Sequence, residues 1–587
     1  MAANREAVVQ GRPELVPIAG AEALKGEGPH AVSAGGVDLI LLRHPRLGPR
    51  VFQGRCPHQG ALLGEGELEG ETLVCRNHRW RFQVATGKRQ GGPECLIACS
   101  VVEAGGQLLV DLAPMRAEQA PVVARRHIDD LPGPRGLPLL GNALQFDLPR
   151  LHAQAEEWAA VYGDLYALRV GKLRTVVVTD PALAQPIFRA RPETWRRTRK
   201  LEQVFIELGV AGVFSAEGAA WRSQRRLAME ALAQRHLRGF YPTLHRVAER
   251  LRRRWEGAAQ RRETVDVVEE LKRFTVDVTT ALTFGHDVNT IEQEGDDVIQ
   301  RRLELLFPAF NKRIFAVFPL WRVVRLPGDR RLDRALGELR AWLETLVAEA
   351  RARLDAEPAR AAKPANFLEA MLAMRDEAGQ PFADEVIFGN LMTMLLAGED
   401  TTAFTLAWAV HQMCESPDAV EALHAELDGV LGETRVPADM EVANRLVYAG
   451  AVANETMRLR PVAPLILFEA ATDTTVADVE IPAGTNVLVL SRPPVRDPAR
   501  FVDPEAFRPE RWLEQGLTPH DAAAHIPFGS GPRICPGRSL ALLEMKVVLG
   551  MLYRNFSVVR QGKASDVKEI YAFTMGPEGL NVQLRPR

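Results

Sequence analysis

Two different hydrophobic patterns divide the chain. Up to about residue 113, short β-type apolar runs at 38–42, 71–74 and 107–111 are separated by Gly and Pro turns, with no long helical periodicity. From residue 151 onward, apolar positions recur at helical spacing, apart from a strand pair at 165–170 and 175–179. The pattern predicts a multidomain protein: a small all-β domain over residues 1–113, then a mainly α domain with small β-sheets over residues 131–587.

Residues 114–130 have neither a period nor a large aromatic side chain, which is typical of a linker. A flexible chain of this length spans roughly 20–25 Å root-mean-square. It would hold the two domains at an effective concentration of order millimolar. The same residues could instead dock as an ordered strap, and the sequence leaves both possibilities open. The Pro-rich stretch 131–142 then begins the second domain.

Bulk composition narrows the class of protein. The 587 residues are 46% hydrophobic and 25% charged, which is globular composition. A net charge of −2 gives no reason to expect a nucleic-acid partner. No apolar run reaches the ~18 residues of a transmembrane helix, and the first residues lack the apolar core of a signal peptide. Six cysteines in a chain of this length do not form a disulfide scaffold, so we expect a reducing, bacterial cytoplasmic setting.

The candidate metal ligands of the first domain are cysteines and histidines in two short loops. Cys56 and His58 form C-x-H, and Cys75 and His78 form C-x-x-H. Two thiolates and two imidazoles could bind zinc, although the C-x-H gap is tighter than usual zinc-finger spacing. The stretches 56–63 and 75–87 resemble the Rieske iron–sulfur family. The resemblance implies that Cys56 and Cys75 bind one iron of a [2Fe-2S] cluster and that His58 and His78 bind the other.

One departure indicates the type of Rieske domain. Rieske proteins of the respiratory-complex type carry an extra cysteine in each loop, and these two cysteines form a disulfide. Ala61 and Asn77 stand at those positions here. The domain therefore resembles the bacterial ferredoxin and oxygenase type, which suits a reducing compartment. Cys95 and Cys99 belong to no such motif and are interpreted as core or surface thiols.

A third cysteine lies in a Gly- and Pro-rich loop directly before an apolar helical run. A thiolate at a helix N-terminus is stabilised by the helix dipole and by unpaired N–H groups. A lone cysteine of this kind would usually be a buried structural residue. The loop, however, resembles the haem-binding sequence F-x-x-G-x-R-x-C-x-G of the cytochrome P-450 superfamily, with matches at Phe528, Gly531, Arg533, Cys535 and Gly537. The resemblance implies haem b, with Cys535 as the ligand of its iron.

Two upstream motifs extend this resemblance. Trp221 and Arg225 are four apart on a helix, and the family uses such a pair to hold a haem propionate, although a solvated basic face has the same pattern. Asp400 and Thr401 interrupt an apolar helix predicted over about 384–415. By resemblance, small residues there open a groove for O₂, and Asp400 and Thr401 relay protons during O₂ activation. The alternative is a Thr that only bends the helix.

A structural motif and one departure complete the pattern. Glu455 and Arg458 match the family's E-x-x-R, and Arg511 would complete a buried Glu–Arg–Arg group beneath the haem. Many family members place an arginine for a haem propionate where Glu469 stands here. A carboxylate cannot serve a propionate, so we hypothesise that Arg492 replaces that arginine from the next strand.

The combined resemblance implies a monooxygenase that inserts one atom of O₂ into an apolar substrate. The cluster would relay electrons to the haem from a separate NAD(P)H-dependent flavoprotein, because the chain contains no G-x-G-x-x-G fingerprint in a strand–helix context. In one alternative, the Rieske centre is a redox sensor or a structural module. In another, the first domain feeds a mononuclear iron, but the nearest histidine pair, His520 and His525, lacks the carboxylate of the required triad.

The substrate itself is not readable from the sequence. Recognition loops are expected at about 197–212 and 296–327, and the second is rich in Leu and Phe. That composition fits an apolar ligand such as a fatty acid or a terpenoid. A core face, or peripheral contact with a membrane, fits the same residues equally well.

Overall fold

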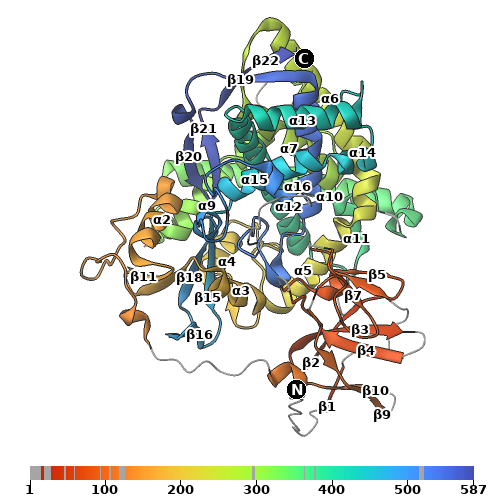
Figure 1. Cartoon of the computed structure of the whole chain (residues 1–587), viewed down its shortest axis with the longest axis vertical. Helices are drawn as coiled ribbons and strands as arrows, with labels where there is room; N and C mark the ends of the chain where they lie inside the picture. Colours follow the sequence, from red (N-terminus) through yellow and green to blue (C-terminus); the bar gives the residue numbers. More distant parts are fainter. Residues whose placement is uncertain are drawn as a thin grey trace, which may run out of the picture.

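The computed structural model describes residues 15–18, 28–44, 48–57, 60–77, 79–92, 94–104, 107–117, 126–293, 298–316, 318–362, 364–375, 379–513, 521 and 523–587. The first domain (red to orange in Figure 1) consists of small antiparallel sheets and lies against the helical body next to α5 (Gly218–Ala231). The predicted order, all-β and then mainly α, is confirmed.

The described part of the first domain contains three antiparallel sheets. Predicted strands at 38–42, 71–74 and 107–111 correspond to β3 (Val37–His44), β6 (Thr72–Val74) and β10 (Gln107–Asp111). Apolar side chains that alternate along these strands form the domain's two core clusters. In sheet order, the strands are β1 (Leu15–Pro17), β10 (Gln107–Asp111) and β9 (Val101–Ala104); β2 (His30–Ala34), β3 (Val37–His44), β4 (Gly48–Gln53) and β8 (Ala98–Cys99); and β5 (Glu67–Glu69), β6 (Thr72–Val74) and β7 (Arg81–Gln83).

The second domain begins with a mixed sheet. Its strands in order are β11 (Leu165–Val170), β12 (Leu173–Val178), β18 (Asn486–Leu490), β15 (Leu465–Ala470) and β13 (Trp195–Arg196). β12 and β18 are parallel although some 300 residues separate them along the chain, so this sheet joins the start of the domain to its last third. Smaller sheets pair β14 (Thr264–Asp266), β22 (Asn581–Pro586) and β19 (Phe556–Arg560), β16 (Thr474–Val476) with β17 (Val479–Ile481), and β20 (Lys568–Ala572) with β21 (Thr574–Glu578).

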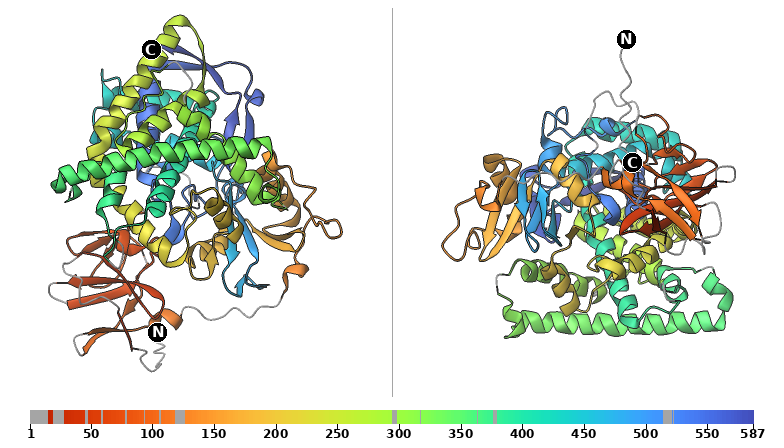
Figure 2. Two further views of the ribbon diagram at one scale, coloured as in Figure 1. Left: turned by 180° about the vertical axis from the view of Figure 1, so that it is seen from behind. Right: turned by 90° about the horizontal axis from the view of Figure 1, so that it is seen from below.

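Helix α12 (Asp384–Met413) is the centre of the helical body. It is apolar around most of its circumference, and such a helix must be buried on all sides. It packs along α7 (Val267–Phe284) and also contacts α15 (Val447–Leu459) and α16 (Arg538–Asn555). Two other long helices are α6 (Gln234–Arg261) and α10 (Pro327–Ala356), and α10 is the long green helix in Figure 2. The shorter helices include α13 (Pro417–Leu431), α2 (Leu151–Tyr162), α3 (Pro181–Arg189), α4 (Arg199–Glu207), α9 (Leu306–Phe315), α11 (Phe367–Ala373) and α14 (Met440–Arg445).

The end of the predicted linker is docked on the second domain. Arg126 forms a two-pronged ion pair with Asp478 at 2.7 and 2.8 Å, and its backbone bridges to Val479 of β17. Asp129 pairs with Arg174 at 2.8 Å. Residues 118–125 lie outside the described part of the chain. Within the described residues, no helix combines the length and the apolar character needed to cross a bilayer.

Glu455, Arg458 and Arg511 come together in a buried group. The carboxylate of Glu455 accepts two hydrogen bonds from Arg458, at 2.8 and 2.9 Å, and one from Arg511 at 3.0 Å. Trp512 Nε1 donates to the same carboxylate at 2.8 Å. Arg458 also donates to the carbonyls of Val495, Pro504 and Ala506. The group therefore ties α15 to the irregular segment 495–512.

Replacing Glu455 by Ala should destabilise the second domain. The substitution leaves two buried guanidinium groups without their anion, which typically costs about 3–5 kcal/mol of unfolding free energy. Thermal and urea denaturation would measure the loss. Glu505→Ala is the matched control, because Glu505 is exposed and contacts Arg496 only at 3.8 Å. Equal denaturation midpoints for the two variants would contradict a structural role for Glu455.

Candidate functional site

The Cys535 loop presents a thiol at the start of helix α16. Two left-handed glycines, Gly529 (φ +72°) and Gly531 (φ +73°), turn the chain, and the Cys535 N–H donates to the Phe528 carbonyl at 2.9 Å. Burial raises the pKa of the Cys535 thiol. The backbone N–H groups of Gly537 and Arg538, together with nearby guanidinium charge, oppose that rise.

An open stripe interrupts the otherwise buried helix α12. Ala397 is exposed and Thr401 is half-buried one turn later, whereas Leu396 and Asp400 are buried. Cys535 is exposed as well, although it lies deep in the molecule at the start of α16, which packs on α12. We infer that these residues line an internal space. Such a space between a thiol and a helix face suits a flat prosthetic group.

Three enclosed arginines lie together with too few anions. The charges of Arg197 and Arg533, together with the larger effect of burial, lower the pKa of Arg191. Burial and Arg533 lower the pKa of Arg197 to about 9. Arg533 has one carboxylate partner, Glu217, at 2.6 Å, and its guanidinium stacks on the Trp221 ring 4.5 Å from the centroid. The arginine trio is defined as Arg191, Arg197 and Arg533.

The arginine trio fits the carboxylates of a haem. Within the arginine trio, five buried guanidinium nitrogens lack a hydrogen-bond partner: Nε and Nη2 of Arg191, Nε of Arg197, and Nε and Nη1 of Arg533. Burial is the main cause of the lowered pKa of these side chains. A guanidinium stays protonated in proteins, so the nitrogens without partners are free to bind an anion. The two propionates of haem b would supply that charge in forked hydrogen bonds.

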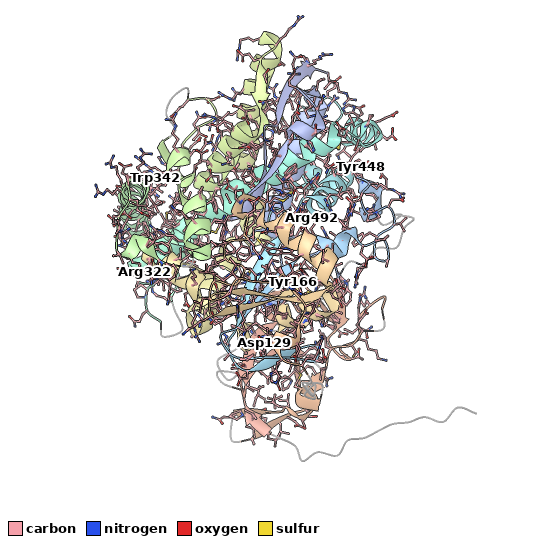
Figure 3. The ribbon with its side chains drawn as sticks, turned by 90° about the vertical axis from the view of Figure 1, so that its left-hand side faces the viewer. Asp129, Tyr166, Arg322, Trp342, Tyr448 and Arg492 are labelled. Carbon is pink, nitrogen blue, oxygen red and sulfur yellow. The ribbon has the colours of Figure 1, made fainter. Side chains whose placement is uncertain are left out.

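The structure corrects the hypothesis for Arg492. Its guanidinium is held by Glu156 at 2.7 Å and Glu569 at 3.0 Å, beside helix α2 (Figure 3). Arg197 lies beside the position of Glu469, at which the family's arginine was expected. Strand β13 places Arg196 opposite Glu469, and Arg197 is the next residue. Two satisfied carboxylate partners make Arg492 a structural residue, whereas the unsatisfied nitrogens point to Arg197.

Arg225 also has partners that the resemblance did not suggest. Trp221 and Arg225 share a face of α5 as expected. Arg225, however, forms a two-pronged ion pair with Glu65 of the first domain, at 3.1 and 3.2 Å. Its remaining nitrogen donates to the carbonyl of Ile534, directly before Cys535, at 2.6 Å. Arg225 therefore joins the first domain to the Cys535 loop.

Asp400 and Thr401 lie on different faces of α12. Asp400 pairs with Lys272 of α7 at 3.1 Å and accepts from Thr574 Oγ1 at 3.4 Å. Burial raises the pKa of Asp400, and the Lys272 charge opposes the rise. The Thr401 hydroxyl donates to the Ala397 carbonyl at 2.8 Å, the helix-bending bond considered as an alternative. Gly398 has a packing role, since a Cβ there would lie 2.4 Å from Thr279 Oγ1 of α7.

The two cysteine loops of the first domain are folded alike. The Cys56 carbonyl accepts from the N–H of Gly60, and the Cys56 N–H donates to the Ala61 carbonyl. Cys75 makes the same pair of bonds, four and five residues on, with Arg79 and Trp80. Gly60 and Arg79 are both left-handed, with φ +68° and +57°.

The two turns share one backbone hydrogen-bond pattern, and each contains one cysteine. Cys56 and Cys75 are buried in one core cluster, which suits two ligands of a single metal group. His58 and His78 lie outside the described residues. The paired turns place two thiols in one core cluster, and with the two histidines of the sequence motifs this donor set fits a [2Fe-2S] cluster of the Rieske type.

Both cysteine loops face the Cys535 loop. A Cβ on Gly60 would lie 3.3 Å from Gly531 Cα and would collide with Arg189, whose Nη2 donates to the Pro57 carbonyl at 3.1 Å. In the second loop, Asn77 accepts from Arg538 of α16, at 3.0 Å to Oδ1 and also at its backbone carbonyl. Arg76 donates to the Leu232 carbonyl at the end of α5 at 3.1 Å.

Sequence reasoning did not identify Arg191, Arg197, Glu65 or Arg538. The first two lie in an arginine-dense stretch, 189–199, which is an unusual run of cations for a segment that packs into a core. That density was an available signal. Nothing in the sequence distinguishes Glu65 or Arg538 from surface charges, because their partners belong to the other domain.

The fold and these sites define a haem–thiolate oxygenase joined to an iron–sulfur domain. The family model for cytochrome P450 matches residues 131–584, and the model for the Rieske [2Fe-2S] domain matches residues 14–99. The chain therefore belongs to the cytochrome P450 family and carries an N-terminal Rieske domain; it is a P450 monooxygenase whose families imply haem and a [2Fe-2S] cluster.

Curated relatives agree with this assignment. The chain is 30% identical over 488 residues to human "25-hydroxyvitamin D-1 alpha hydroxylase, mitochondrial", covering 79% of this chain and 94% of the relative. It is 29% identical over 445 residues to "Cyclooctatin synthase" of Streptomyces melanosporofaciens, covering 75% and 92%. It is 26% identical over 470 residues to "Bifunctional cytochrome P450/NADPH--P450 reductase" of Gibberella moniliformis, covering 78% of this chain and 40% of that protein.

The variant Arg197→Gln tests the arginine trio. Haem loss to apomyoglobin should be roughly tenfold faster, the effect of losing one charge-assisted hydrogen bond. The haem-free protein should be no less stable than wild type, because the substitution removes a repulsive buried cation. Arg199→Gln is the matched control, since Arg199 is exposed and pairs with Glu469. If both variants lose haem at the wild-type rate, Arg197 does not hold a propionate.

Proposed function

We propose that the Rieske domain reduces the haem within the same chain. A separate NAD(P)H-dependent flavoprotein would be oxidised and would supply electrons singly to the cluster. Two electrons and two protons would be consumed for each O₂: one oxygen atom enters a C–H bond of an apolar substrate to give an alcohol, and the other leaves as water. The reactive chemistry at O₂ belongs to the haem when it is bound.

The observation that carries this proposal is the docking of both cysteine loops on the Cys535 loop. Asn77, in the second cysteine loop, touches Arg538, three residues beyond Cys535. Gly60, in the first, packs against Gly531, four residues before Cys535. A sensor or purely structural module would have no need to present its metal-binding edge to the haem ligand. The Gibberella relative, by its printed name, also carries a reductase in the same chain.

An aromatic cluster near the acid–alcohol pair supports an apolar substrate. Phe205, from the first expected recognition loop, stacks on Phe310, from the second, with ring centroids 4.6 Å apart. Phe573 stacks on Phe307 at 5.7 Å, and the residue after Phe573 is Thr574, which contacts Asp400. The human and Streptomyces relatives are named for 25-hydroxyvitamin D and cyclooctatin. We therefore propose a bulky hydrophobic substrate that displaces part of this cluster.

The two remaining cysteines bear on the cellular compartment, and the position of the first domain bears on the electron donor. Cys95 is exposed and Cys99 is buried, and the structure leaves both as free thiols, which accords with the proposed reducing bacterial cytoplasm. With the first domain on the thiolate side of the P450 domain, the flavoprotein would reach the haem only through the cluster. Its docking surface would then lie on the Rieske domain.

Proton delivery is assigned to Asp400. Its carboxylate lies between Lys272 and Thr574, so it can receive a proton from one side and pass it along the hydroxyl. Asp400→Asn should lower product formation by about 10²-fold, the usual scale for loss of a general acid. Thr574→Val should have a smaller effect. Product formed per NAD(P)H would be the measurement, and wild-type turnover in Asp400→Asn would exclude this role.

The electron relay is tested by reducing the cluster selectively in anaerobic, CO-saturated protein. Stopped-flow absorption should show cluster oxidation and the CO–haem Soret band at one shared rate. That rate should not change on dilution, because the transfer is intramolecular. Cys75→Ser, which removes a cluster ligand, is the control for direct reduction of the haem. No haem reduction within a catalytic turnover would support the sensor alternative instead.

A further inference from the structure

Arg538 is the side chain that connects the two metal-binding regions most directly. It is the first residue of α16, and its Nη1 donates to Asn77 Oδ1 at 3.0 Å and to the Asn77 backbone carbonyl. Asn77 lies between Cys75 and His78 in the second cysteine loop. One guanidinium therefore spans from the helix that follows the haem ligand to the loop that holds the cluster.

The charge of Arg538 acts on both metal ligands. Arg538 is three residues beyond Cys535 and bonds to Asn77, two residues beyond Cys75, so its guanidinium lies near both sulfurs. Burial lowers the pKa of Arg538, and the charges of Cys535 and Cys75 oppose that change. The Phe528 ring covers it at 5.8 Å. A guanidinium keeps its charge in such a site, and the partly buried position limits screening by salt.

Contacts other than those of Arg538 also join the two domains. Arg225 pairs with Glu65, Arg55 pairs with Glu193 at 2.9 Å, and Arg76 bonds to the end of α5. These contacts lie on other elements of the interface. Removing Arg538 should therefore leave the Rieske domain docked while it alters the local charge and the contact at Asn77.

We propose that Arg538 is a positioning residue for electron transfer that also raises the reduction potentials of both the cluster and the haem. A fixed positive charge stabilises the more negative, reduced form of each centre. Because Arg538 acts on both centres, its loss should change the difference between the two reduction potentials less than it changes either potential. The forked bond to Asn77 holds the second cysteine loop against α16. The positioning part rests on the proposed function, and the effect on the potentials does not.

Two substitutions of Arg538 separate the effect of its charge from the effect of its contact with Asn77. In Arg538→Gln, redox titrations followed by EPR for the cluster and by absorption for the haem should give lower potentials at both centres. Transfer measured by stopped flow should be roughly tenfold slower, the scale for losing one charge-assisted hydrogen bond. One nitrogen, Nη1, makes both bonds to Asn77 in the wild type. Arg538→Lys keeps the charge on a shorter side chain that no longer reaches Asn77, so both potentials should stay near wild type while transfer still slows.

The matched control is Arg554→Gln, which removes the same charge from α16 about 24 Å further along the helix. It should change neither the potentials nor the rate. Wild-type potentials in Arg538→Gln would overturn the electrostatic role, and wild-type transfer in both Arg538 variants would overturn the positioning role. If the wild-type chain shows no transfer at all, the proposed relay and the positioning role both fail, and the potentials of Arg538→Gln still decide the electrostatic role.

Discussion

Enclosed arginines place positive charge around the Cys535 loop, inside the P450 domain. Arginines are costly to enclose unless anions accompany them. Here the anions come from three sources: Glu217 within the P450 domain, Glu65 from the Rieske domain, and the haem propionates that the arginine trio fits. Haem binding and docking of the Rieske domain therefore both supply negative charge to these arginines. The thiolate of Cys535 is itself part of that balance.

These charges also couple the Rieske domain to the haem-ligand loop. Arg225 bonds at once to Glu65 and to the backbone beside Cys535, so a shift of the Rieske domain acts on the haem-ligand loop. Helix α12 carries the opposite side of the site, and its packing on α7 at Gly398 leaves little freedom there. Adjustments to cofactor or substrate are thus expected at the aromatic cluster and not at α12.

The sequence predicted the features that short-range interactions determine, namely element bounds and short motifs. Strand β11 has the predicted bounds, and α12 lies within two residues of its predicted range, because their apolar spacing and flanking turns are strong signals. The cysteine motifs are also local, so both metal-binding regions could be found. Charge pairing is decided by tertiary contact. Arg492 was assigned to the haem because its strand is adjacent, yet Glu156 and Glu569, distant in sequence, satisfy it. Arg225 and Arg538 depend on a second domain that spacing cannot place.

Asn77 shows how the chain manages without the disulfide of the respiratory-type relatives. That disulfide ties the two cysteine loops to each other covalently. In this chain Ala61 and Asn77 are both buried, and Asn77 bonds instead to Arg538 of the P450 domain. The constraint on the second loop has moved from within the Rieske domain to the interface. Backbone hydrogen bonds of Cys75 with Arg79 and Trp80 already close this turn within the first domain, and Arg538 adds a contact from the other domain. Under the proposed relay, that same contact would hold the cluster loop close to the haem-ligand loop.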